Sequence, residues 1–194
     1  DAARGGGAIT QYNRNLLLWR YPGADGLKTG YIDESGFNLA LTAEKNGMRL
    51  IGVLLGGEGS TPRAGLEGTA RDGAALLDYG FNNFVTVEPK NLDLEPVSIW
   101  KGRERTIPVA PDRKVVVTVE RELENRLQTS VELEKNLEAP KREGEKIGVL
   151  TVSADNMEVG RFDLVASHSV ERGSPFRVVW DTIRLWWNTN MRKQ

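Results

Sequence analysis

The chain has 194 residues, 39% hydrophobic and 27% charged, and its 26 basic and 27 acidic residues leave a net charge of -1. These values are typical of a globular protein and exclude a disordered chain or a general polyanion binder, so we expect no nucleic-acid partner. The absence of Cys and the single His168 exclude thiolate chemistry and metal sites built from Cys or His clusters.

Glycine content and charge divide the chain into three predicted segments, 1–84, 85–174 and 175–194. Sixteen of the 21 Gly lie between Gly5 and Gly80, whereas the second segment is acidic and the third carries a net charge of +3. No apolar run reaches the roughly 18 residues that a membrane-spanning helix needs. Residues 1–7, with three consecutive Gly, are left out of the fold prediction.

The first segment predicts an antiparallel sheet followed by a helix. Strands are expected at 26–32, 37–44 and 48–55, with a tight hairpin at Asn46-Gly47 between the last two. Apolar residues then recur at helical spacing after Thr61-Pro62, a capping residue followed by a first-turn proline. We expect this helix to end at Gly80 and to pack one face on the sheet.

Beyond residue 85 the pattern changes to short strands. Such runs are expected at 114–119, 126–134, 147–153 and 161–166, separated by polar or Pro/Gly turns. Their number and spacing predict a small all-β sandwich. Strands and helices in separate stretches make the fold class α+β.

The third segment predicts an amphipathic helix that lies in a membrane interface. Its apolar side carries three of the five Trp, and its basic residues would attract anionic lipid. The alternative is a helix that docks its apolar face on its own β domain or on a partner. The expected apolar face is Phe176, Val179, Trp180, Ile183, Trp186, Trp187 and Met191, and the polar face is Arg177, Asp181, Arg184, Asn188, Arg192 and Lys193.

Lys28-Thr29-Gly30 is the tripeptide most suggestive of chemistry. A strand with this sequence can present an ammonium and a hydroxyl to an anionic substrate, while glycine lets a substrate backbone lie alongside. By itself the tripeptide is weak evidence, and it favours a surface Lys and Thr beside a turn glycine.

The surrounding sequence resembles a known family. The resemblance rests on Asn13-Arg14-Asn15, Gly23-Ala24-Asp25-Gly26, Gly36-Phe37-Asn38-Leu39, Gly47-Met48-Arg49-Leu50-Ile51, Leu76-Leu77-Asp78-Tyr79-Gly80-Phe81 and, further on, Leu137-Glu138-Ala139-Pro140 and Ile147-Gly148. In this succession the chain is similar to the C-terminal half of the D-alanyl-D-alanine carboxypeptidases, the low-molecular-mass penicillin-binding proteins, with their appended β domain.

The resemblance implies a fold and an activity. The fold would be the C-terminal part of a serine β-lactamase-like transpeptidase domain, then a β-sandwich and an amphipathic membrane anchor. The reaction would be removal of the terminal D-alanine from the peptidoglycan stem pentapeptide through a serine acyl-enzyme, which β-lactam antibiotics trap. The protein would lie at the periplasmic face of the bacterial cytoplasmic membrane and would need no cofactor.

The resemblance also assigns roles to individual residues. Lys28 and Thr29 would bind substrate, and Gly30 would permit its close approach. Arg14 would help to hold the peptide carboxylate, although a structural salt bridge is an equal alternative. Tyr31 stands where some relatives have His, and neither Arg63 nor Arg71 fits the spacing of a further cleft arginine.

The chain departs from the family pattern at the nucleophile. The family places Ser-x-x-Lys upstream of Lys-Thr-Gly, but the 27 residues before Lys28 contain no Ser. Ser98-Ile99-Trp100-Lys101 matches only in letters, because it lies on a predicted strand of the β domain. We therefore expect a fragment that does not hydrolyse peptides by itself, and we expect His168 to be a surface or packing residue.

Two other interpretations remain open. In the first, the chain is a non-catalytic, membrane-associated interaction module. In the second, another chain supplies the missing half, either a further copy in a homo-oligomer or a complementing N-terminal half. Residues 1–84 would otherwise leave uncovered apolar faces on the sheet and helix, which predicts pairing or aggregation.

Overall fold

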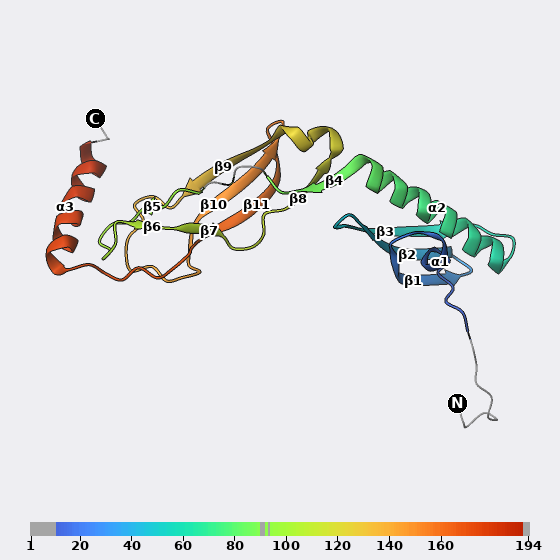
Figure 1. The fold of residues 1–194 in the computed structure, drawn as a ribbon. Coiled ribbons are helices and arrows are strands. Elements are labelled where there is room, and N and C mark those ends of the chain that lie inside the picture. Colours follow the sequence, from blue (N-terminus) through green and yellow to red (C-terminus); the bar gives the residue numbers. More distant parts are fainter. Residues whose placement is uncertain (1–10, 90–91, 93, 192–194) are drawn as a thin grey trace, which may run out of the picture. The chain divides into compact units, whose positions relative to one another are not determined.

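The chain forms two compact units, Asp1–Val85 and Thr86–Gln194, in a computed structural model that describes residues 11–89, 92 and 94–191 (Figure 1). Helices and antiparallel sheets occur in separate stretches, which confirms the predicted α+β class. The expectations for residues 1–7, Arg192 and Lys193 lie outside the described residues.

The first unit is a three-stranded antiparallel sheet with helices on one face. Strands β1 (Ala24–Ile32), β2 (Gly36–Lys45) and β3 (Met48–Gly57) are neighbours in that order and confirm the three predicted strands. Helix α2 (Pro62–Asn83) runs along the sheet, and the short α1 (Leu17–Arg20) precedes β1 (Figure 1). Their shared core consists of Leu17, Tyr21, Leu39, Leu41, Ala43, Ala70 and Leu77.

Helix α2 begins where the sequence predicts and ends later. The Thr61 Oγ accepts a hydrogen bond from the Ala64 amide at 3.1 Å, which satisfies one of the free amides of the first turn. The predicted end at Gly80 is wrong, because the helix continues to Asn83. A Cβ at Gly80 would lie 2.4 Å from the Leu50 Cδ1, so this glycine permits close packing on β3 and does not terminate the helix.

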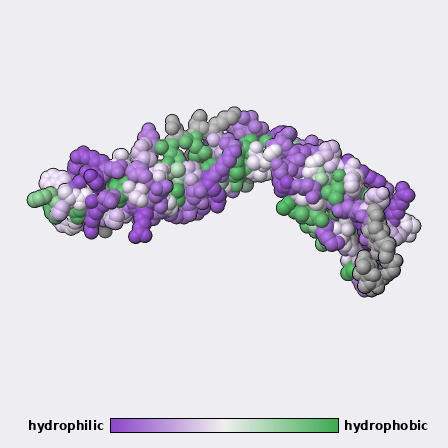
Figure 2. Space-filling model, turned by 60° about the horizontal axis from the view of Figure 1, so that its bottom comes forward, coloured by the Kyte–Doolittle hydropathy of each residue, from purple (hydrophilic) through white to green (hydrophobic). Residues whose placement is uncertain are grey.

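The face of the sheet away from α2 is open. Ile51, Val53 and Leu55 of β3 are between 60% and 77% exposed, and they alternate with Leu50 and Leu54, which pack into the core below α2. Hydrophobic side chains gather on the surface of this unit (Figure 2). The expected uncovered apolar face of the sheet is therefore present.

The second unit is built from short antiparallel strands. Its largest sheet has the order β7-β11-β10-β9, and β4-β8 and β5-β6 form two-stranded sheets (Figure 1). The elements are β4 (Phe84–Val87), β5 (Val97–Ser98), β6 (Thr106–Ile107), β7 (Val109–Pro111), β8 (Val117–Glu120), a 3₁₀ helix (Arg121–Arg126), β9 (Leu127–Leu133), β10 (Lys146–Ala154) and β11 (Met157–Ala166). The strands expected at 126–134, 147–153 and 161–166 are confirmed, whereas the run at 114–119 forms a strand only from Val117.

The predicted C-terminal helix is present as α3 (Pro175–Met191) and belongs to the second unit. Six of its apolar side chains are not packed against that unit, since they are between 53% and 91% exposed. They are Phe176, Val179, Trp180, Ile183, Trp186 and Trp187. Within the described part of the chain, no helix has the length and hydropathy that crossing a membrane requires.

Candidate functional site

A cleft of about 1010 Å³ lies in the first unit beside β1. One wall is the strand segment from Lys28 to Tyr31, and the other parts are the segment before α1 and the turn that leads into α2. The lining residues are Gln11, Tyr12, Arg14, Lys28, Thr29, Gly30, Tyr31, Phe37, Gly59, Ser60, Thr61, Pro62 and Leu66. The structure thus brings Arg14 and the Lys-Thr-Gly tripeptide to one concave surface.

The tripeptide lies on the edge strand of the sheet. Lys28 and Gly30 pair with β2 residues, and the Lys28 Nζ donates a hydrogen bond to the Thr29 carbonyl at 2.5 Å. A Cβ at Gly30 would meet only the Asn38 Cβ, at the ordinary contact distance of 3.8 Å. The fold itself therefore does not require glycine here, so its missing side chain leaves room in the cleft.

Two asparagines hold the segment that carries Arg14. Asn15 is buried, its Nδ2 donates to the Gly26 carbonyl at 3.0 Å, and its Oδ1 accepts from the Leu17 amide at 3.1 Å. The Asn13 Oδ1 accepts from the Asn15 amide at 2.9 Å. These bonds tie the segment to the start of β1 and leave Arg14 exposed in the cleft. Sequence reasoning used both asparagines for the resemblance but missed this structural role.

The cleft is cationic. Arg14 and Lys28 line it together, and none of its lining residues is Asp or Glu. Among residues 11–89, 92 and 94–191, neither cation forms an ion pair, so the structural salt bridge considered for Arg14 is not found there. Cations without carboxylate partners in a concave site favour an anionic ligand.

Tyr31 is held by its neighbours. Its hydroxyl donates to the Asp33 Oδ1 at 2.9 Å, and its ring lies 4.6 Å from that of Phe37. The hydrogen bond to the Asp33 carboxylate raises the pKa of Tyr31 above its usual value. The phenol therefore stays protonated at neutral pH, which makes it unsuitable as a general base.

The cleft holds hydroxyl groups but no activated nucleophile. Ser60 lines it, yet within the described part of the chain no basic side chain hydrogen-bonds that hydroxyl. Ser98 and Lys101 lie in the second unit, where the Lys101 Nζ pairs with the Glu138 Oε2 at 2.6 Å. Across the described ranges, no group of three or more His, Cys, Asp or Glu is placed to bind a metal ion.

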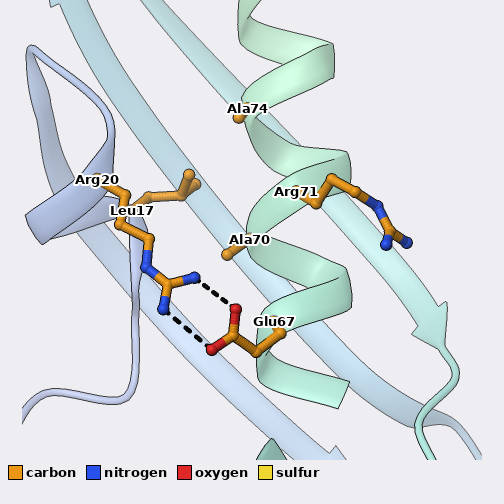
Figure 3. Close-up of a pocket in the computed structure, with 6 residues that line it drawn as sticks. All are labelled: Leu17, Arg20, Glu67, Ala70, Arg71 and Ala74. Carbon is orange, nitrogen blue, oxygen red and sulfur yellow. Dashed lines mark hydrogen bonds and ion pairs between the residues drawn. The ribbon is translucent and has the colours of Figure 1, made fainter. Parts of the chain in front are cut away.

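A second hollow of about 260 Å³ lies between α1 and α2. Arg20 donates two hydrogen bonds to Glu67 across it, at 2.6 and 3.0 Å, and Arg71 points away from this pair (Figure 3). Arg63 lies 3.9 Å from the same carboxylate. Neither Arg63 nor Arg71 is among the residues that line the cationic cleft. The ion pair joins the two helices across this hollow, so these charges have a structural role.

Comparisons with known proteins match both units. Residues 4–59 match the D-alanyl-D-alanine carboxypeptidase family, and residues 84–172 match the family described as penicillin-binding protein 5, C-terminal domain. Carboxypeptidase DacA of Escherichia coli is 31% identical over 181 residues, which cover 91% of this chain and 43% of that protein. DacF of Bacillus subtilis is 28% identical, over 82% of this chain and 40% of that protein.

Solved structures give the same result. Penicillin-binding protein 5 from Haemophilus influenzae is 28% identical with a TM-score of 0.73, over 84% of this chain and 47% of that one. Carboxypeptidase DacD from Francisella tularensis is 29% identical with a TM-score of 0.55, over 84% of this chain and 40% of that one. The chain spans less than half the length of these relatives. In both units it matches the C-terminal portion of the D-alanyl-D-alanine carboxypeptidases.

Proposed function

We propose that the chain is the C-terminal part of a serine-type D-Ala-D-Ala carboxypeptidase and that its cationic cleft binds the C-terminal end of the peptidoglycan stem peptide. The observation that carries the proposal is the meeting of Arg14 with Lys28-Thr29-Gly30 in a cleft whose lining contains no carboxylate. In this scheme residues 1–84 form one wall of the active site, 85–174 a spacer and 175–194 a membrane anchor.

The chemistry follows from the charges of the substrate. Its terminal carboxylate would accept hydrogen bonds from Arg14 and the Thr29 hydroxyl, with Lys28 supplying positive potential near the scissile bond. A serine from outside this sequence, activated by its lysine base, would attack the penultimate carbonyl. The peptide bond to the terminal residue would then break and release D-alanine. Water would then hydrolyse the acyl-enzyme, and a β-lactam would be trapped as the same ester.

Carboxylate recognition is tested by NMR on the chain itself. We titrate it with acetyl-D-Ala-D-Ala and, as the matched control, with the same dipeptide carrying a C-terminal amide. We expect shift changes at Lys28, Thr29, Gly30 and Arg14 with the carboxylate and much weaker changes with the amide. Equal responses to both ligands, or responses outside the cleft, would contradict the proposal.

We further propose that α3 docks on the periplasmic face of the cytoplasmic membrane. Its exposed side carries three Trp besides Phe and Ile, and Trp prefers the headgroup region, where the ring is buried and the N–H stays hydrated. Basic residues of the same helix would add attraction to anionic lipid. The residues proposed to enter the interface are Phe176, Trp180, Ile183, Trp186 and Trp187.

Vesicle sedimentation tests this docking. Deletion of 175–194, or the double change Trp186→Ala and Trp187→Ala, should abolish or strongly reduce binding to phosphatidylglycerol-containing vesicles. Trp19→Ala is the matched control, because Trp19 is equally exposed but lies in the first unit. Undiminished binding after the deletion would refute the anchor.

The open sheet face supports a complementing partner. Ile51, Val53 and Leu55 would expose an apolar row on an edge strand in any free form of the first unit. We propose that the N-terminal half of the carboxypeptidase covers this face. Val53→Lys should then raise the solubility of the free chain and disrupt its association with that half in a co-purification assay. Undisturbed association would favour the interaction-module alternative.

A further inference from the structure

Helix α3 is attached to the second unit through its polar side. Asp181 is 14% exposed, and its Oδ2 accepts a hydrogen bond from the Lys101 amide at 2.8 Å. The Arg177 guanidinium donates to the carbonyls of Arg103 and Glu104, at 3.2 and 3.3 Å. One turn further on, Leu185 is buried. Three residues spaced by four therefore form a single contact side of the helix.

The loop that receives these contacts, residues 100–104, is itself tied to the β strands and their connections. The Trp100 amide donates to the Leu137 carbonyl at 2.8 Å, and the Arg103 amide donates to the Glu171 carbonyl at 2.8 Å. Lys101 has a positive φ of 58°, which is uncommon for a residue other than glycine. Its carbonyl accepts from the Gly173 amide just before the helix, at 2.8 Å. The loop is thus a fixed base for α3.

The contact side and the apolar side of α3 point in nearly opposite directions. At 3.6 residues per turn, the mean direction of Arg177, Asp181 and Leu185 lies roughly 160° around the helix from that of the exposed apolar side chains. The polar contacts hence fix the rotation of the helix about its axis and leave its apolar side free. The amphipathic pattern of the sequence does not predict that contacts with the β unit fix the rotation of α3 about its axis.

We propose that Asp181 and Arg177 form an orientation clamp, which holds α3 on the 100–104 loop so that its apolar side faces away from the β unit before any surface is bound. The functional consequence rests on the proposed membrane docking: a clamped anchor holds the β unit at one orientation to the bilayer, whereas a free helix would act only as a flexible tether. Asp181 and Arg177 are positioning residues in this account.

The clamp is tested with two spin labels on the full chain. Because the chain contains no Cys, Met157→Cys and Arg184→Cys give two unique, exposed labelling sites, on the β10–β11 hairpin and on α3. Pulsed electron paramagnetic resonance then measures the distribution of distances between them. We expect a narrow distribution that becomes several-fold broader with Asp181→Ala.

Three further variants separate the clamp from general damage to the helix. Asp181→Asn keeps an oxygen that can accept from the Lys101 amide and should keep the distribution narrow, whereas Arg177→Gln should broaden it. Thr182→Ala is the matched control, since its hydroxyl donates a hydrogen bond to the Val178 carbonyl of the same helix. Circular dichroism verifies that each variant retains the helix. A broad native distribution, or one unchanged by both Asp181→Ala and Arg177→Gln, overturns the clamp.

Vesicles of phosphatidylethanolamine and phosphatidylglycerol then test the orientation. The native distribution should remain unchanged on binding, because the apolar side is already free, and Asp181→Ala should still sediment with the vesicles. A native distribution that shifts on binding would show that the helix leaves the loop, and it would overturn the clamp. Failure of the native chain to sediment would count against membrane docking, while the distribution in solution still decides the clamp.

Discussion

The two cations of the cleft in the first unit differ from a typical cation of the second unit. In the second unit, Lys141 pairs with Glu134 and Glu145 at 2.9 and 3.0 Å, as part of a surface on which many cations have acidic partners. In the first unit, Arg14 and Lys28 share a cleft and form no ion pair within the described residues. Paired charges on a surface have a structural role, whereas unpaired cations in a concave site are available to bind a ligand. The comparison therefore supports the proposal that the cleft of the first unit binds the peptide.

Removal of a cleft cation should have the largest effect. Arg14→Ala should weaken acetyl-D-Ala-D-Ala binding by about 10- to 150-fold, because a hydrogen bond to a charged group contributes about 1.5–3 kcal/mol, and Lys28→Ala should weaken it through the loss of positive potential. Calorimetry or NMR titration measures the loss. Arg20→Ala removes a cation that pairs with Glu67 outside the cleft, so it should leave binding unchanged. An equal loss of binding affinity in all three variants would contradict the proposal that the cleft cations bind the peptide.

Two glycines of the first unit sharpen the comparison between binding and stability. A Cβ at Gly65 would lie 2.0 Å from the Phe37 ring, so Gly65→Ala should lower the free energy of unfolding by about 1–3 kcal/mol, despite the better helix propensity of Ala. Gly30→Ala should change stability by less than about 0.5 kcal/mol, because its Cβ would have room, yet it should weaken peptide binding. Denaturant unfolding and ligand titration of both variants check this. Strong destabilisation by Gly30→Ala would assign that glycine to folding.

The smallest expected effect is a loss of stability of the second unit at acidic pH. The Arg142 amide and then the Lys141 ammonium stabilise the Glu145 carboxylate and lower its pKa below the usual 4.5. Its contribution to stability is therefore present above pH 4.5 and is lost as the pH falls through the lowered pKa of the folded state. Glu145→Gln should reduce the difference in unfolding free energy between pH 7 and pH 3, by less than about 1 kcal/mol because water screens this half-exposed carboxylate. An identical pH dependence in the variant would show that Glu145 contributes nothing.

Local signals in the sequence predicted much of the fold. Asn46 and Gly47 adopt the positive φ angles, 51° and 77°, that the hairpin between β2 and β3 requires, and Thr61-Pro62 starts α2 as expected. The failure at Gly80 has a physical reason. A glycine that ends a helix and one that packs against another strand look alike in a sequence, and only the contact with Leu50 distinguishes them.

The sequence analysis named residues that line the cleft but not the contacts that hold them in place. Lys28 and Arg14 were found through the family pattern, and the structure places them together. The hydrogen bond from Asn15 to the Gly26 carbonyl and the contact between Asp181 and the Lys101 amide were not predicted. Each joins a side chain to a backbone group, 11 residues away in the first contact and 80 residues away in the second. Backbone groups leave no trace in residue types, so no pattern in the sequence could reveal these contacts.

The most direct test of the account is to label the protein in its source with a fluorescent penicillin and to measure the intact mass of the labelled species. We expect a labelled protein well above 21.5 kDa whose proteolytic peptides include those of this chain. Such a species would be the acylated carboxypeptidase of which the chain forms the C-terminal part. A species of 21.5 kDa that contains these peptides and takes up no label would contradict the account.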